Sequence, residues 1–296
     1  INLECPLIRK PSPSAKRGPT FGVPDTCVRG LQAIGIDVAG LANNHIMDHG
    51  PSGLRSTIEA LEASGVGHVG AGENLEAAGQ MAIRVVRGLR VGILALAEHE
   101  FGIASPETPG ANPLSPIDFV RHMRVHRNRV DYLIVLLHGG KEYYPYPSPE
   151  LQKVCRFMVE EGADAILCQH SHCPGCYEHY RGGHIAYGQG NFLFDRHLRK
   201  RKNANRGFLV RLSITAERTA EMELLPYIQS PEFRGARRMP PDAALAFCSE
   251  LEQRSARARD DLFVAEQWRK FCRARRHFYF SVLRGHAIPM QALNRI

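Results

Sequence analysis

Three features of the sequence predict an α/β fold built on a mixed sheet. The chain has 296 residues, 44% of them apolar, which suits one large domain with an appendage or two small domains. Apolar strand-like runs alternate with helical patterns as far as Cys168. Beyond that point several strand-like runs follow one another, and a helical region comes after them. Alternation followed by consecutive strands is typical of a mixed-sheet α/β fold.

The first elements surround a short buried strand. Residues 8–20 are rich in Pro, Ser and basic residues and predict a loop, and residues 24–34 predict a helix. Residues 37–42 (Asp-Val-Ala-Gly-Leu-Ala) are a short apolar run that predicts a buried strand. An apolar stripe at helical spacing over 54–63 predicts the next helix, and 68–71 predicts another strand.

The middle of the chain repeats this alternation. Residues 81–86 and 90–97 predict a hairpin. Residues 116–127 predict a helix, and the continuous apolar run at 132–137 (Tyr-Leu-Ile-Val-Leu-Leu) predicts a buried strand. Residues 149–161 place their apolar side chains on one face, which predicts an amphipathic helix.

Strands then dominate. Residues 165–168 predict another buried strand. Four strand-like runs follow it, at 177–180, 184–187, 207–214 and 221–226. No long helical pattern separates these runs, so we expect part of the sheet to be antiparallel.

A helical C-terminal extension with excess positive charge completes the prediction. We expect residues 1–230 to form the α/β domain and residues 231–296 to form a basic helical extension that packs on it. Lys and Arg outnumber Asp and Glu two to one from His197 onward, whereas the whole chain carries a net charge of +8. Such a region can bind nucleic acid, acidic lipid or an anionic substrate, or it can be a solvated helical face. The sequence has no RNA- or DNA-binding motif, so we expect no nucleic-acid partner.

Cysteine usage and hydropathy bear on the compartment. No apolar run reaches the roughly 18 residues that a membrane span requires, and the first residues do not form a signal peptide. Cys173 and Cys176 form a CxxC, which can be a redox pair or half of a zinc site, but no second such pair exists among the eight cysteines. We expect mainly unpaired thiols, with a disulfide or a structural metal as alternatives, and a cytoplasmic location.

Metal-competent side chains recur directly after the predicted strands. Asn44 and His45 follow strand 37–42, His138 follows strand 132–137, and His170 and His172 follow strand 165–168. Ligand sites in open α/β sheets lie at the carboxyl ends of strands, so these side chains are expected to meet. A single histidine among the 14 is usually a surface or core residue. Three strand ends with histidine favour a metal site, and neutral imidazole and carboxylate suit Mn, Zn, Fe or Ni.

Five stretches of the chain carry long motifs in a fixed order. They read Asn2-Leu-Glu-Cys-Pro6; Gly40-Leu-Ala-Asn-Asn-His-Ile-Met-Asp-His-Gly50 with Gly67-His-Val-Gly-Ala-Gly72; Leu137-His-Gly-Gly-Lys-Glu-Tyr143; Gly162-Ala-Asp-Ala-Ile-Leu-Cys-Gln-His-Ser-His172; and Tyr187-Gly-Gln-Gly-Asn-Phe-Leu-Phe-Asp195. Together they resemble the CapA (poly-γ-glutamate capsule synthesis) family from residue 2 to about residue 226. That family belongs to the calcineurin-like metallophosphoesterases, whose fold is a β-sandwich flanked by helices.

The resemblance implies a metal-dependent catalytic site. The implied metal ligands are Glu4, Asn44, His138, His170 and His172. By the same resemblance, His45 is the catalytic histidine beside Asn44, and Asp48 orients one of these two side chains. Glu142 and Asn191 would line the substrate cleft, with a structural role as the alternative for Asp48, Glu142 and Asn191.

The sequence also departs from the family pattern. A strand with a Gly-Asp that supplies a metal-ligating Asp in the family does not occur in residues 1–296, and Gly139 stands where the family often has Trp. We therefore expect one or two divalent transition-metal ions and a reshaped pocket.

Three functions remain open from the sequence. The first is a hydrolase that uses metal-activated water on a phosphoester or a peptide or poly-γ-glutamate-like substrate. The second is a peptide-modifying epimerase that abstracts a Cα proton. The third is a non-catalytic component of capsule polymer synthesis.

Overall fold

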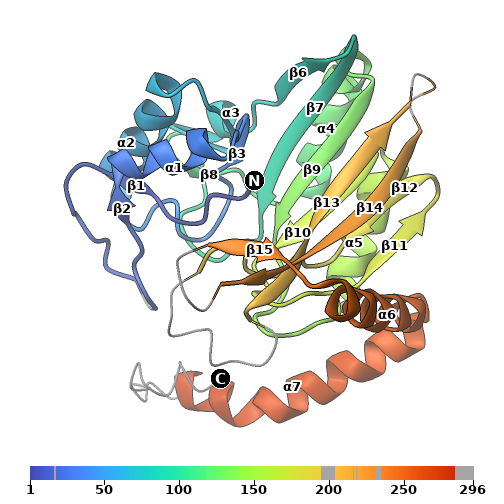
Figure 1. Ribbon diagram of the computed structural model, residues 1–296. Coiled ribbons are helices and arrows are strands. Elements are labelled where there is room, and N and C mark those ends of the chain that lie inside the picture. Colours follow the sequence, from blue (N-terminus) through green and yellow to red (C-terminus); the bar gives the residue numbers. More distant parts are fainter. Residues whose placement is uncertain (17, 195–203, 216, 218, 231–234, 284–296) are drawn as a thin grey trace.

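The computed structural model describes residues 1–16, 18–194, 204–215, 217, 219–230 and 235–283, and its centre is a six-stranded mixed sheet (Figure 1). The strand order is β11-β12-β10-β9-β7-β6. The four central strands run parallel, and β6 and β11 pair antiparallel at the two edges. The strands are β6 (Ala82–Val86), β7 (Leu89–Ala97), β9 (Tyr132–His138), β10 (Ala165–Gln169), β11 (Tyr177–Tyr180) and β12 (Gly183–Ala186). The predicted mixed sheet is confirmed.

The register of this sheet brings three strand ends together. Ala97 at the end of β7 pairs with His138 at the end of β9, and His138 pairs with Gln169 at the end of β10. The residues that follow these strands therefore leave the sheet at the same edge.

A second sheet covers part of one face of the first. It consists of β13 (Arg206–Ile214), β14 (Ala220–Gln229) and β15 (Ala236–Arg238), all antiparallel, and it lies in front of the larger sheet in Figure 1. Buried Phe208 of β13 packs with Ala186 of β12 and Leu167 of β10. This arrangement confirms the predicted β-sandwich. The sequence analysis missed β15 because Ala-Arg-Arg has no strand pattern.

Two helices cover the other face of the larger sheet. Helices α4 (Pro116–His126) and α5 (Pro149–Glu160) bury apolar side chains against β9 and β10. Each begins with a Ser-Pro pair, in which the serine hydroxyl accepts a backbone N–H of the first turn and proline occupies a position that needs no N–H donor. Both helices were predicted within one residue.

The N-terminal part of the chain packs beside β7. Strands β3 (Val38–Gly40) and β4 (Gly67–Val69) pair in parallel, and helix α2 (Gly50–Ala63) buries Leu54 and Leu61 in the same core. Helix α2 begins four residues before the predicted start. The remaining elements here are short: β1 (Leu7–Ile8), β2 (Val23–Pro24), a 3-10 turn (Asp25–Cys27), α1 (Val28–Ala33), β5 (Ala71–Gly72), α3 (Leu75–Ala78), β8 (Gly110–Ala111) and a 3-10 turn (Arg127–Arg129).

Gly70 breaks the strand predicted at 68–71 into two. Its φ is +93°, and a Cβ at this position would lie 2.6 Å from the Cβ of Ala95. The chain turns sharply here and continues as β5, which pairs with β8. Glycine is needed both for the backbone conformation and for the close approach to β7.

The C-terminal region predicted to be helical contains β15 at its start, and two helices follow this strand. Helix α6 (Pro241–Ala258) is followed by α7 (Asp261–Leu283), which runs along the lower side of the molecule in Figure 1. Ser255 of α6 accepts a hydrogen bond from the backbone N–H of Tyr177, and Gln152 of α5 donates to the carbonyl of Ala258. The domain boundary at residue 230 stays a prediction, and residues 231–234 and 284–296 lie outside the described part.

The expectations about the cysteines and about membrane spans can be compared with the structure. All eight cysteines are free thiols. Among the described residues, no helix combines the length and the apolar character that crossing a membrane requires.

One ion pair with a buried carboxylate links three of these elements. Arg156 of α5 donates two hydrogen bonds to Glu178 of β11, at 3.0 and 2.9 Å, and a third to Asp261 at the start of α7. Glu178 is buried and also accepts from the Tyr187 hydroxyl. We expect Arg156→Met to lower the free energy of unfolding by about 3 kcal/mol, because it leaves a buried carboxylate without its cation. Urea denaturation measures this.

Arg181→Met is the matched control. The Arg181 side chain is 69% exposed and pairs with Glu160 at 3.4 Å. Exposed pairs contribute little, so its effect should stay below about 1 kcal/mol. Equal effects of the two substitutions would show that the Arg156 pair has no special role.

Candidate metal centre

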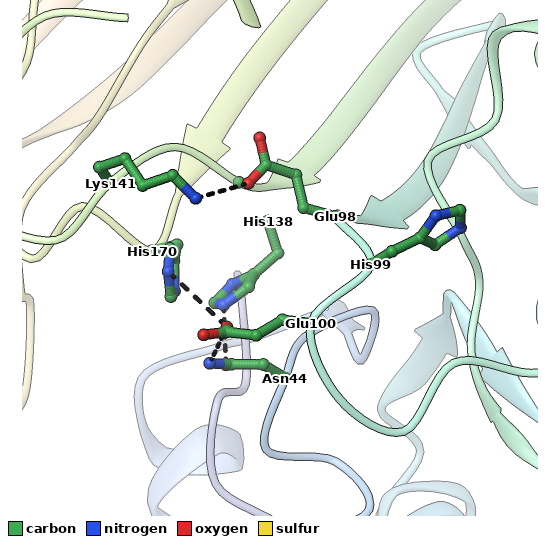
Figure 2. A pocket seen from close by; sticks show the side chains of 8 residues that line it. Asn44, Glu98, His99, Glu100, His138, Lys141 and His170 are labelled. Carbon is green, nitrogen blue, oxygen red and sulfur yellow. Dashed lines mark hydrogen bonds and ion pairs between the residues drawn. The ribbon is translucent and has the colours of Figure 1, made fainter. Parts of the chain in front are cut away.

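The candidate site forms where the strand ends meet loops of the N-terminal part. Figure 2 shows His138, His170, Glu100 and Asn44 pointing toward one another around a small cavity. His138 is the last residue of β9, His170 follows β10, and Asn44 lies in the turn after β3. The structure thus brings together the side chains that the sequence placed after three different strands.

His138 lies at the centre of this group. Its Nε2 is 3.1 Å from Oδ1 of Asn44 and 3.6 Å from Oε1 of Glu4. Its Nδ1 is 3.4 Å from Nδ2 of Asn2, which also lies 3.5 Å from Oε2 of Glu4. Asn2 is thus an orienting residue that the sequence analysis did not single out.

His170 and His172 reach the site through an unusual backbone. Both have positive φ, +96° and +52°, which turns the chain so that two imidazoles two residues apart face one centre. Nε2 of His172 is 3.9 Å from Oε1 of Glu4, and its Nδ1 is 2.8 Å from Oδ1 of Asn191. Asn191 also donates to the carbonyls of His172 and Ala204, so it fixes the His172 ring.

The donor atoms suit a divalent transition metal. One ligand atom each from Glu4, His138 and His170 lies within 4.8 Å of the other two. Oε1 of Glu4 and Nδ1 of His170 are buried and have no hydrogen-bond partner among the described residues. Buried polar atoms are normally paired, so these two indicate a partner such as a cation.

Burial sets the protonation states that metal binding needs. Burial, followed by the charges of neighbouring histidines, holds the pKa of His138 well below its ordinary value. Burial and the charge of His172 lower the pKa of His170 to about 4. Both imidazoles are therefore neutral near pH 7, and neutral imidazole is the form that binds metals. Burial raises the pKa of Glu4, so this carboxylate needs a cation beside it to stay ionised.

His45 and Asp48 form a hydrogen-bonded pair next to this group. Nδ1 of His45 is 2.6 Å from Oδ2 of Asp48, which also accepts the backbone N–H of Phe21 at 2.6 Å. Lys16 pairs with the other Asp48 oxygen and lies 3.2 Å from the same His45 nitrogen. Burial alone would raise the pKa of Asp48, but these hydrogen bonds lower it below its ordinary value. Asp48 therefore stays ionised and is hydrogen-bonded to the His45 ring, while its predicted role of orienting His45 or Asn44 stays a prediction.

A cavity of about 100 Å³ opens beside the metal-competent residues (Figure 2). It is lined by Asn44, Glu98, His99, Glu100, His138, Gly139, Lys141 and His170. The sequence analysis missed Glu98 and Glu100, although they follow the predicted strand 90–97 as His138 follows the predicted strand 132–137. Applying the strand-end argument to a fourth strand would have found them. Lys16 gave no such signal, because it lies in a loop rich in Pro and Ser.

The two residues expected to line the cleft are placed differently. Glu142 is exposed, and its negative charge acts on Glu4 and His170, so it lies near the site. Asn191 is buried and holds His172. Neither lines the cavity, and their roles in substrate binding stay predictions.

Comparison with known proteins bears directly on the family. Residues 1–196 match the family described as bacterial capsule synthesis protein PGA_cap. The chain belongs to this family. The capsule biosynthesis protein CapA of Bacillus anthracis is 29% identical over 76% of this chain and 56% of the relative. The PGA biosynthesis protein CapA of Bacillus subtilis is 29% identical over 67% of this chain and 52% of the relative.

Another relative is named a probable polyglutamine synthesis accessory protein of Mycobacterium tuberculosis, 29% identical over 66% of this chain and 55% of its own length. The chain thus spans about half the length of the curated relatives it matches.

Solved structures give more distant similarities. One is a putative 5′-nucleotidase from Staphylococcus aureus, with a TM-score of 0.46 and 16% identity over 78% of this chain and 47% of the other. Another is the calcineurin-like phosphoesterase YfkN from Bacillus subtilis, with a TM-score of 0.42 and 14% identity over 76% of this chain and 72% of the other. The fold described above rests on the strand pairing of the chain itself.

Proposed function

We propose that this PGA_cap chain is a metal-dependent enzyme of hydrolase type. The observation that carries the proposal is the cluster of Glu4, His138 and His170, with two buried donor atoms that lack a hydrogen-bond partner among the described residues. Asn44 and His172 extend the ligand set, as the family resemblance implies. One or two divalent ions, Mn, Zn, Fe or Ni, are compatible with these donors. A bound ion of this kind polarises a substrate oxygen and lowers the pKa of water.

The remaining residues would handle the proton and the substrate. The charge of His45 acts on Glu4, His138 and His170, so its ring is near the cluster. Held by ionised Asp48, it would give a proton to the leaving group as a general acid. Lys141 at the cavity would attract an anionic group, either a phosphate or a carboxylate.

The cavity limits which part of a substrate enters. Sites for whole small molecules usually have volumes of about 300–1,000 Å³. A cavity of about 100 Å³ admits only one reacting group. We therefore propose that a larger phosphoester, or the end of a peptide or poly-γ-glutamate-like chain, presents a single group here while the rest stays outside.

Metal content per chain tests this function first. We expect one or two transition-metal ions in the wild type after incubation with Mn²⁺ or Zn²⁺, measured by elemental mass spectrometry, and fewer in His170→Gly. Glycine suits the φ of +96° at this position, so the substitution removes the imidazole without straining the backbone. His179→Ala, an exposed histidine of β11, is the control and should keep the wild-type content. A wild type that binds no metal would contradict the proposal.

The name of one relative favours a second candidate. A protein named a probable synthesis accessory protein suggests a non-catalytic role in polymer synthesis. Release of phosphate or a free amino group from substrates would favour the hydrolase. Exchange of substrate Cα–H in D₂O would instead favour a peptide epimerase, the remaining alternative. Metal binding without any turnover would favour the accessory role.

A further inference from the structure

Glu100 lies opposite the metal-competent histidines, on a strand end that the family motifs quoted above do not include. The Glu98 N–H donates to the carbonyl of His138, which continues the β7–β9 pairing by one residue. The chain then turns, with the Glu100 N–H donating to the carbonyl of Glu98. Figure 2 shows the resulting position: the Glu100 carboxylate lies next to the Asn44 amide and near the His170 ring.

The distances place Glu100 beside two of the proposed ligands, Asn44 and His170. Its Oε2 accepts a hydrogen bond from Nδ2 of Asn44 at 2.6 Å and lies 3.9 Å from Nε2 of His170. Two donor atoms that share an ion at bond lengths of about 2.0–2.2 Å are separated by roughly 3–4 Å. The Glu100–His170 separation falls in this range, as does the 3.6 Å between His138 and Glu4.

Charge and burial favour the same role. Glu4 is the one carboxylate in the Glu4–His138–His170 cluster. A second carboxylate balances the charge of a divalent cation. The His170 side chain is only 9% exposed, and its Nε2 is the ring nitrogen that faces Glu100. Glu100 itself is 46% exposed, so it is accessible to an ion that enters from solvent.

We propose that Glu100 supplies a carboxylate ligand to the metal centre, on the side of the cavity formed by Asn44 and His170. This inference rests on the proposed function, because it requires that the site binds a divalent ion. The competing role for Glu100 is to orient the Asn44 amide through their hydrogen bond without contacting the ion.

Titration of the full chain with Co²⁺ alone separates these roles. The visible spectrum of bound Co²⁺ depends on the number and type of its ligands and on their geometry. We expect Glu100→Gln to lower the number of bound ions or to change this spectrum. Glu98→Gln is the control, because Glu98 lines the same cavity but has Lys141 at 4.0 Å. We expect this control to keep the wild-type stoichiometry and spectrum.

Two results would overturn the role of Glu100. Wild-type stoichiometry and spectrum in Glu100→Gln, even with affinity reduced 10- to 100-fold, would show that Glu100 acts through Asn44. Equal changes in both variants would show a general effect of charge. In either case the wild type still binds Co²⁺ and the proposed function stands. Failure of the wild type to bind Co²⁺ would instead overturn both.

Discussion

Replacing His45 with Gln is expected to lower kcat by about 10²–10⁴, the usual contribution of a general acid or base. The metal content should stay at the wild-type value, because Nδ1 of His45 is bonded to Asp48 at 2.6 Å and not to the Glu4–His138–His170 cluster. The assay uses whichever phosphoester or peptide the wild type turns over, and elemental mass spectrometry is run on the same samples. Retained metal with lost turnover would assign proton transfer to His45.

Asp48→Asn is the companion to this substitution. The Asn side chain can still accept the Phe21 N–H. The substitution removes the negative charge of Asp48, which fixes the His45 ring and pairs with Lys16. We expect a smaller loss in kcat than for His45→Gln, together with a shift in the pH profile, because Asp48 acts through His45. Loss of bound metal in His45→Gln would contradict the assignment and make His45 a ligand instead.

Long apolar runs made the centre of the fold predictable. Strand 132–137 and helix 149–161 were placed within one residue. The strand is buried on both faces and the helix on one, and each kind of burial leaves a strong pattern of apolar residues in the sequence. Some of the elements of two to four residues, among them α3, β8 and β15, were missed. Their stability comes from contacts with distant parts of the chain, and a local pattern does not record such contacts.

The same reason limits prediction of the site. His138 and His170 were found because each directly follows an apolar strand. Glu100 follows one as well, but residues 81–97 predict a hairpin, and a hairpin pattern does not by itself indicate a ligand site at its strand end. Lys16 reaches Asp48 from a loop 32 positions earlier in the chain, and nothing in its neighbours signals the contact. The positive φ of His170 is a tertiary feature too, since histidine does not require it.

Replacing Tyr144 with Ala is expected to lower the free energy of unfolding by about 3–5 kcal/mol, as for other buried aromatic residues. Tyr144 lies in the segment between β9 and α5, and its ring is 5.7 Å from Trp268 and 4.6 Å from Phe271, both on α7. The preceding residue, Tyr143, stacks on His172 at 5.9 Å and donates its N–H to the Ser171 carbonyl. Helix α7 thereby holds a segment that contacts the metal centre. Urea denaturation and hydrogen exchange over residues 139–148 measure the effect.

Tyr144→Phe separates ring packing from the hydroxyl group. The Tyr144 hydroxyl is buried without a hydrogen-bond partner among the described residues, so its removal should be neutral or stabilising. Trp268→Ala removes the other partner of this aromatic contact, so it should also increase hydrogen exchange over residues 139–148. In the double variant with Tyr144→Ala, the two effects should differ from additivity by about 0.5–1.5 kcal/mol, the coupling energy of an aromatic pair. Additive effects would show that α7 stabilises the molecule without holding the segment. The contact of Tyr144 with Trp268 would then have no role in shaping the site.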